Sequence, residues 1–143
     1  MTLAGPSLVF VGGTVGTASR YILTTVTPQW FGVPFATLGI NVVGALLLGL
    51  LLELLALRGP DRGRFRAVRL LLGTGFLGGF TTYSALAVDT DNLLRSGHIL
   101  EAAAYAVITV VLGVAGAIAG MVLAHRLAGE PGPGNEPQDA GTA

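Results

Sequence analysis

Apolar residues gather in four long stretches along the chain, and short polar or charged segments separate them. The stretches run from about Leu3 to Val26, from Pro34 to Leu57, from Leu70 to Val88 and from Ala102 to Ala124. A helix needs about 20 predominantly apolar residues to cross the hydrocarbon core of a bilayer. The pattern therefore predicts an all-α membrane protein with four transmembrane helices.

The third stretch has a middle that suits a helix poorly. Between Gly73 and Ser84 the sequence holds four glycines and four serines or threonines, and a glycine inside a helix costs about 1 kcal/mol relative to alanine. We expect the third helix to be broken between Gly78 and Ser84. Backbone groups freed at such a break need partners in a bilayer. Either neighbouring hydroxyl groups or a cation bound by carbonyl oxygens can supply them.

The arginines mark the two ends of these helices unequally. One end carries Arg58, Arg62, Arg64, Arg66, Arg69 and Arg126, and the other carries Arg95 and Arg20. Cytoplasmic loops of membrane proteins are enriched in basic residues. The bias predicts that both termini lie in the cytoplasm. We expect a multi-pass protein of the cell (plasma or inner) membrane.

The composition is typical of a membrane protein and argues against several functions. Of the 143 residues, 52% are hydrophobic and 11% are charged, whereas soluble domains carry about 25% charged residues. Eight basic residues balance eight acidic ones, so no nucleic-acid partner is expected. The chain has no cysteine, and His98 and His125 are far apart in sequence. Because no phosphate loop, nucleophile elbow or dinucleotide fingerprint occurs in the right context, no enzymatic activity is expected.

Two segments of different character follow from this pattern. Residues 1–127 are expected to form the four-helix transmembrane domain. Residues 128–143 are rich in proline, glycine and acids, a composition typical of disordered segments. We expect them to form a disordered cytoplasmic tail.

Several side chains within the apolar stretches can carry chemistry. Asn41 lies in the middle of the second stretch, where its amide either donates to an anion or bonds to another helix. Arg20 either reaches the membrane interface or draws anions into a vestibule. Phe76, Phe80 and Tyr83 either pack in the core or present their positive ring edges to a small anion.

Small residues at helical spacing predict close helix association. The pairs are Gly12 and Gly16, Gly75 and Gly79, and Gly116 and Gly120, with Gly113 on the last stretch as well. Such pairs let the backbones of membrane helices approach one another. Since four short spans offer little room for a pore, we expect an oligomer.

Three segments carry a resemblance to a known family. Residues 12–21 read GGTVGTASRY, residues 36–44 read ATLGINVVG and residues 75–84 read GFLGGFTTYS. The first is similar to a first-helix signature of paired glycines followed by an arginine and an aromatic. The second is similar to a second-helix asparagine segment, and the third to a third-helix break. Together they resemble the CrcB/Fluc family of fluoride channels, from Gly12 to about Ala124.

The resemblance implies an antiparallel dimer of four-helix subunits that exports fluoride passively and so reduces its toxicity in the cytoplasm. Two narrow pathways would run along the subunit interface. One structural sodium ion, not transported, would lie at the dimer centre on the main-chain carbonyls of Gly78 and Thr81 from each subunit. The residues assigned to the fluoride pathway are Asn41, Tyr83, Ser84, Phe80, Arg20 and Thr37.

The chain departs from the family pattern at the aromatic pair. Two phenylalanines three residues apart usually follow the break, whereas this chain has Tyr83 and Leu86, with Ala85 at a usually polar position. Since each pathway in the family takes one ring of the pair from each subunit, a homodimer of this chain would lack the second ring. Together with the arginine bias, this favours an antiparallel heterodimer with a paralogous subunit over a pair of identical copies.

Two other functions stay open at this point. A small multidrug-type transporter also uses four short helices, but it needs an acid in its first helix, and none occurs between Met1 and Leu52. A non-conducting or half-pore partner subunit of a heterodimeric fluoride channel is compatible with Ala85 and Leu86.

Overall fold

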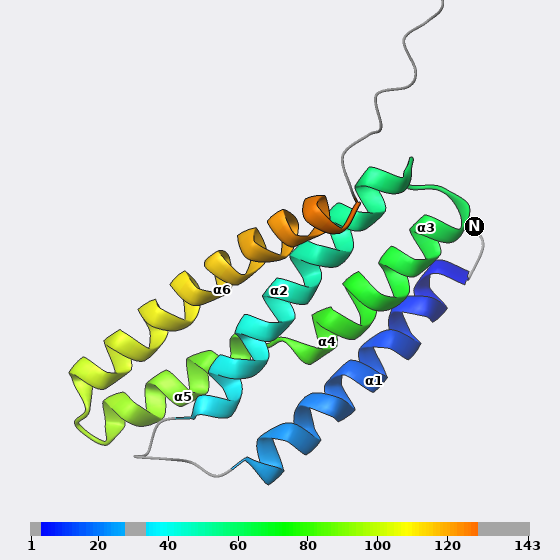
Figure 1. Ribbon diagram of the computed structural model, residues 1–143. Helices are drawn as coiled ribbons and strands as arrows, with labels where there is room; N and C mark the ends of the chain where they lie inside the picture. Colours follow the sequence, from blue (N-terminus) through cyan, green and yellow to red (C-terminus); the bar gives the residue numbers. More distant parts are fainter. Residues whose placement is uncertain (1–3, 28–33, 129–143) are drawn as a thin grey trace, which may run out of the picture.

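The computed structural model describes residues 4–27 and 34–128, and every element in these ranges is a helix (Figure 1). The elements are α1 (Ala4–Val26), α2 (Phe35–Arg58), α3 (Gly63–Val68), η1 (Arg69–Leu77), α4 (Gly78–Phe80), α5 (Tyr83–Arg95) and α6 (Ile99–Ala128). The π-helical segment η1 follows α3 directly and leads directly into α4. The expected disordered tail lies outside the described residues from position 129 onward.

Three segments are long and apolar enough to cross a membrane: Phe35–Arg58, Gly63–Arg95 and Ile99–Ala128. They correspond to the second, third and fourth predicted spans. The first predicted span is a helix of 23 residues, α1, but it is not among these three. Glycines, hydroxyl residues and Arg20 make α1 less apolar than the others. The count of four spans therefore stays a prediction.

Several hydroxyl groups of α1 are satisfied within the helix. Thr14 donates to the carbonyl of Phe10 at 2.8 Å, and Ser19 donates to the carbonyl of Val15 at 2.9 Å. A hydroxyl that bonds its own backbone no longer needs water, so these residues oppose membrane insertion less than their polarity alone indicates.

Glycines form the closest helix contacts, and these contacts lie within the chain. A Cβ atom at Gly12 or Gly16 would overlap the backbone of η1 or α4, and one at Gly79 would overlap the backbone of α1. One at Gly120 would overlap the backbone of α2, whereas Gly113 has nothing within 4 Å. The glycine pairs thus hold the helices of one chain together, and their spacing by itself requires no oligomer.

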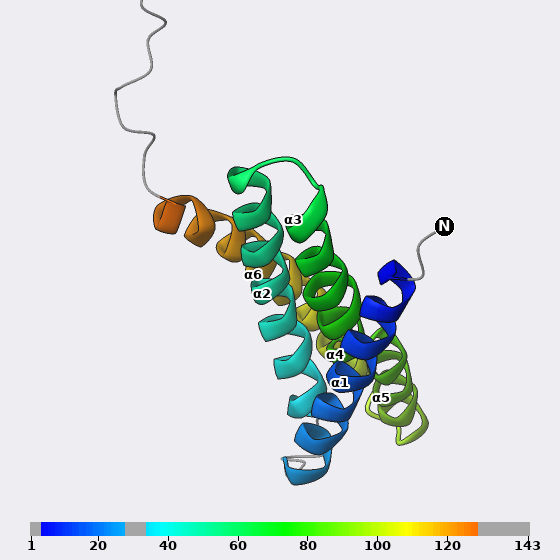
Figure 2. The ribbon, with the colours of Figure 1, turned by 90° about the vertical axis from the view of Figure 1, so that its right-hand side faces the viewer.

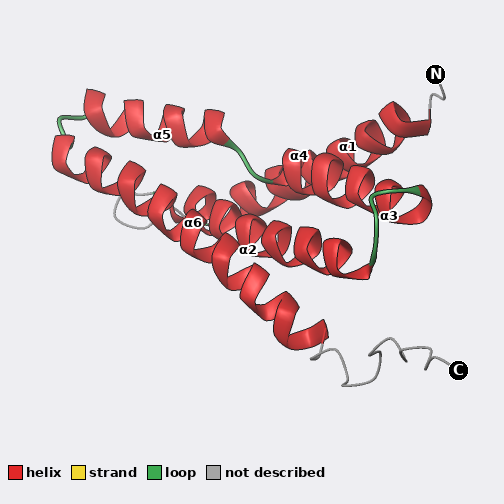
Figure 3. Cartoon of the chain, turned by 90° about the horizontal axis from the view of Figure 1, so that it is seen from above, coloured by secondary structure: helices red, strands yellow, loops and turns green. Residues whose placement is uncertain are grey.

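The helices pack in two groups. The long helices α2 and α6 pack along each other, and α1 packs along η1 and α4 (Figure 2). Beyond Phe80 the chain changes direction, and α5 packs on α6 instead (Figure 3). Buried residues at that contact are Leu86, Leu93, Ala102 and Tyr105. The third span is therefore two helical arms joined by Thr81 and Thr82, within the stretch where a break was expected.

The basic residues lie mostly at one end of the bundle. The start of α1, the connection from α2 to α3 and the end of α6 share this end, and the turn from α5 to α6 lies at the opposite end (Figure 1). Arg58, Arg62, Arg64, Arg66, Arg69 and Arg126 belong to the first end, and Arg95 belongs to the second. The grouping expected from the sequence is present in the fold, while the assignment of this end to the cytoplasm stays a prediction.

Candidate functional site at the helix break

Two extended residues interrupt the third span. Thr81 has φ −76° and ψ 157°, and Thr82 has φ −153° and ψ 124°. The Thr82 hydroxyl accepts the N–H of Ala85 at 3.1 Å, which is the bond that an N-cap threonine makes at the start of a helix. The sequence Gly-Gly-Phe-Thr-Thr at residues 78–82 therefore ends α4 and begins α5 within the span.

Asn41 on α2 holds the extended backbone in place. Its Nδ2 donates to the carbonyl of Thr82 at 3.0 Å, and its Oδ1 accepts the N–H of Thr82 at 2.8 Å. Both backbone groups of Thr82 are thus paired with one side-chain amide. This is the bond to another helix that the sequence left open as an alternative, and one N–H of Nδ2 remains for another acceptor.

The break removes the usual donors of two carbonyl groups. In a continuous helix the N–H of residue i+4 donates to the carbonyl of residue i. The N–H of Thr82 donates to Asn41 instead of Gly78, and the N–H of Ala85 donates to the Thr82 hydroxyl instead of Thr81. Gly78 and Thr81 are the two residues expected to coordinate sodium, and oxygen ligands of this kind suit a hard cation.

Arg20 reaches the same break from α1. Its Nε donates to the carbonyl of Gly79 at 3.2 Å, and the hydroxyl of Thr17 donates to the same oxygen at 3.4 Å. Arg20 is half-buried, and its guanidinium bonds another helix of the same chain. Arg20 therefore satisfies a carbonyl of α4 and places a positive charge beside the break.

The aromatic residues take different positions. Phe80 is buried and its ring stacks on that of Phe76, with 5.8 Å between centroids and 9° between planes. Tyr83, by contrast, is 82% exposed in the single chain. Ser84 is exposed and its hydroxyl lies 3.1 Å from that of Thr82. Phe80 therefore packs in the core, while Tyr83 and Ser84 project from the first turn of α5.

A pocket of about 240 Å³ lies beside the break, between α1, α2 and α5. Arg20, Thr37, Ala85 and Asp89 line it together with residues from the ends of α1 and α2. It brings together two residues assigned to the fluoride pathway, Arg20 and Thr37. Asn41, Phe80, Tyr83 and Ser84 do not line this pocket.

Asp89 also lines this pocket, and the sequence did not assign it to the fluoride pathway. Its Oδ2 accepts the hydroxyl of Tyr105 on α6 at 3.2 Å, and the hydroxyl of Thr109 donates to the carbonyl of Tyr105 at 2.7 Å. Ala85 and Asp89 are one helical turn apart on α5, so their spacing placed them on one face. That Asp89 and Arg20 line the same pocket could not be predicted from the sequence, because it depends on how α1 and α5 are placed in the fold.

Comparison with known proteins identifies the family of this arrangement. A family model described as "CrcB-like protein, Camphor Resistance (CrcB)" matches residues 7–121. The chain belongs to the CrcB family. The resemblance seen in the glycine, asparagine and threonine segments of the sequence is thereby confirmed. Asn41, Arg20 and the Thr81–Thr82 break all fall inside the matched range.

Relatives within the CrcB family are similar over most of their length. The chain is 53% identical over 116 residues to "Fluoride-specific ion channel FluC 2" of Leifsonia xyli subsp. xyli, which covers 81% of this chain and 80% of the relative. It is 52% identical over 107 residues to "Fluoride-specific ion channel FluC 1" of Cutibacterium acnes, covering 74% and 75%. It is 42% identical over 122 residues to "Fluoride-specific ion channel FluC" of Ruminiclostridium cellulolyticum, covering 84% and 88%. These names are of ion channels and not of enzymes, in agreement with the prediction that the chain has no enzymatic activity.

Proposed function

We propose that this chain is a subunit of a fluoride-specific channel that exports fluoride passively across the cell membrane and so lowers its toxicity in the cytoplasm. The observation that carries the proposal is the identity of up to 53% with relatives named as fluoride-specific ion channels. The family match over residues 7–121 includes the helix break and its partners, Asn41 and Arg20. We place both ends of the chain on the cytoplasmic side. The start of α1 and the end of α6 lie at the same end of the bundle as the arginine-rich α2–α3 connection, and basic loops are enriched on the cytoplasmic side.

Fluoride passage needs groups that replace water in stages. Arg20 and Thr37 in the pocket beside the break offer a positive charge and a hydroxyl group to an entering anion. Asn41 has one N–H left after it bonds Thr82, and Ser84 and the edge of the Tyr83 ring project outward from the start of α5. Phe80 contributes by packing, because its ring is buried against Phe76. Passive passage of fluoride along these groups requires no ATP and no coupled ion.

A structural sodium ion would suit the carbonyl oxygens at the break. Gly78 and Thr81 have lost their helical N–H donors to Asn41 and to the Thr82 hydroxyl. A hard cation shared with the same carbonyls of a second subunit would compensate them. We therefore assign to sodium the role of holding the break, and not that of a transported ion.

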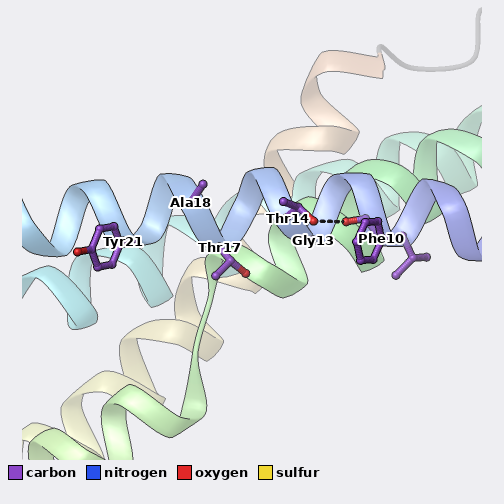
Figure 4. A pocket seen from close by; sticks show the side chains of 7 residues that line it. Phe10, Gly13, Thr14, Thr17, Ala18 and Tyr21 are labelled. Atoms are coloured by element: carbon purple, nitrogen blue, oxygen red, sulfur yellow. Dashed lines mark hydrogen bonds between the residues drawn. The ribbon is translucent and has the colours of Figure 1, made fainter.

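An antiparallel dimer would cover a hollow face of α1, shown in Figure 4. This face carries an open pocket of about 640 Å³, lined by Val9, Phe10, Gly13, Thr14, Thr17, Ala18 and Tyr21. Gly13 contributes no side chain, and Thr17 touches the carbonyl of Gly79 at the break. A partner seated here would therefore lie next to the residues proposed to bind sodium.

We favour a paralogous subunit as the partner over a second copy. Leu86 is buried between α5 and α6, so an exposed ring follows the break only at Tyr83. The relatives in Leifsonia xyli and Cutibacterium acnes carry the numbers 2 and 1 in their names, as expected where a genome encodes two such chains. A half-pore or non-conducting role within such a pair is the second candidate function.

Growth of a bacterium that lacks its own fluoride exporter tests the function. Cells that produce this chain, with its paralogue where required, should grow in sodium fluoride at concentrations that stop the parent strain. Cells producing Asn41→Asp at equal membrane levels should not. Equal sensitivity of all strains, with the protein verified in the membrane, would argue against fluoride export.

A further inference from the structure

A groove of about 390 Å³ lies at the arginine-rich end, where α2 meets the segment that leads into α3. Its walls are Leu52, Leu55, Ala56, Gly59, Asp61, Phe65 and Arg69. Leu52 is 41% exposed and belongs to the apolar segment Phe35–Arg58. The groove therefore runs from the part of α2 that is apolar enough to lie in hydrocarbon to the charged connection beyond it.

The segment from Arg58 to Arg69, which supplies Gly59, Asp61, Phe65 and Arg69 to the groove, carries four further arginines, here called the rim arginines. Arg58, Arg62, Arg64 and Arg66 are all exposed, and within the described part of the chain none of them forms an ion pair. Asp61 is the only acid between positions 58 and 69.

Within the described residues, two acids near this end, Asp61 and Glu53, are already engaged. Both carboxylate oxygens of Asp61 accept hydrogen bonds from Arg69, at 3.0 and 2.7 Å. Oε1 of Glu53 on α2 lies 2.9 Å from Nε2 of His125. Neither carboxylate is therefore available to neutralise the rim arginines.

Two of the arginines are held in place beside the apolar wall. Arg69 has five N–H donors, and Asp61 takes two of them through Nε and Nη2. The guanidinium of Arg64 lies 5.0 Å from the centre of the Phe65 ring, a cation–π contact. Donors for an anionic group and an apolar surface thus meet within one short segment.

We propose that this groove binds an anionic phospholipid of the surrounding leaflet. The phosphate would bond the free donors of Arg69 and the rim arginines, and one acyl chain would lie along Leu52, Leu55 and Phe65. Arginine binds phosphate in a planar, two-bond geometry, and basic residues next to a membrane span attract anionic lipid about fivefold more strongly for each charge. The apolar floor distinguishes such a lipid from a free phosphate ion, which has no chain to bury. Lipid binding here does not depend on fluoride conduction.

Spin-labelled lipids in nanodiscs test this assignment. The full chain is placed in phosphatidylcholine discs, and electron paramagnetic resonance measures how much spin-labelled phosphatidylglycerol or phosphatidylcholine is immobilised at the protein surface. Discs expose both leaflets, so a change of membrane orientation in a variant does not affect the result. Wild-type protein should prefer phosphatidylglycerol severalfold, and the combined variant R62Q/R64Q/R66Q should lose this preference. Arg95→Gln, an arginine at the opposite end paired with Asp91, should keep it.

Two further arms separate a lipid site from a diffuse positive surface. Ala56→Phe fills the groove and leaves every charge in place, so it should lower the preference severalfold, whereas R62K/R64K/R66K should retain most of it. Glycerol phosphate in solution should not displace the labelled lipid. Absence of a preference in the wild type, an unchanged preference in Ala56→Phe, or displacement by glycerol phosphate would each overturn the proposal.

Discussion

At the scale of single residues, Asn41 connects α2 with the break in the third span. Its amide accepts from and donates to the backbone of Thr82, at 2.8 and 3.0 Å. The cost of leaving buried backbone groups unpaired is larger than the net gain of a typical hydrogen bond. Asn41 is therefore important both for folding and, in the proposed pathway, for contact with the ion.

Asn41→Asp should destabilise the protein, because a carboxylate cannot donate to the Thr82 carbonyl and places negative charge beside it. We expect the free energy of unfolding in detergent to fall by about 2 kcal/mol. The matched control is Asn92→Asp on the exposed face of α5, which should change it little. Equal stability of Asn41→Asp and the wild type would show that this pair of bonds does not hold the break.

At the scale of elements, close contact between α2 and α6 depends on a few glycines. A Cβ at Gly120 would overlap the carbonyl of Leu46, while a Cβ at Gly113 on the same helix would meet nothing within 4 Å. One helix thus offers two alanine substitutions of the same chemistry with opposite expected effects.

Gly120→Ala should lower the free energy of unfolding by about 1–3 kcal/mol, because the new methyl group forces the helices apart. Gly113→Ala should instead raise it by up to about 1 kcal/mol, because alanine favours the helix. Denaturation of both variants beside the wild type measures the difference. A destabilisation of similar size in both would contradict the packing of α6 on α2.

The connection between α2 and α3 is expected to lose one stabilising contact in acid. The hydrogen bonds from Arg69 hold the pKa of the Asp61 carboxyl below its ordinary value of 3.8. A carboxylate with a lowered pKa in the folded state stabilises it above pH 3.8 and loses that contribution as the pH falls through the lowered value. The difference in unfolding free energy between the wild type and Asp61→Asn should therefore be present at pH 6 and vanish in strong acid. If the difference in unfolding free energy persisted in acid, its cause would not be the ionised Asp61 carboxylate.

The helices and the break could be predicted from the sequence more readily than the contacts between them. The apolar stretches and the break at Thr81 and Thr82 follow from local hydropathy and glycine content. The π-helical form of η1 does not follow from them, and neither does the close approach of the α1 backbone to η1 at Gly12 and Gly16.

Contacts between distant parts of the chain were likewise hidden. The bonds of Arg20 to Gly79 and of Tyr105 to Asp89 join residues 59 and 16 positions apart, and no spacing rule connects such pairs. Asn41 is an intermediate case. Its need for a partner was evident from its place in an apolar stretch, but Thr82 as that partner was not.

At the scale of the whole molecule, the uneven distribution of arginine predicts one orientation in the membrane. The chain has no cysteine, so single cysteines report accessibility without background. In intact cells, a membrane-impermeant maleimide should label Ser96→Cys, in the turn before α6, and should not label Arg64→Cys until the membrane is opened. Equal labelling of both would indicate insertion in both orientations, and would favour a pair of identical chains over the proposed heterodimer.

Anion efflux from liposomes tests the central claim most directly. Vesicles containing the purified chain, alone and with its paralogue, are loaded with fluoride or chloride, and a selective electrode records release in sodium and in sodium-free buffer. The proposal predicts fluoride release that exceeds chloride release, needs sodium and is lost in Asn41→Asp. Absence of fluoride release with and without the paralogue, or release of chloride at the same rate, would contradict it.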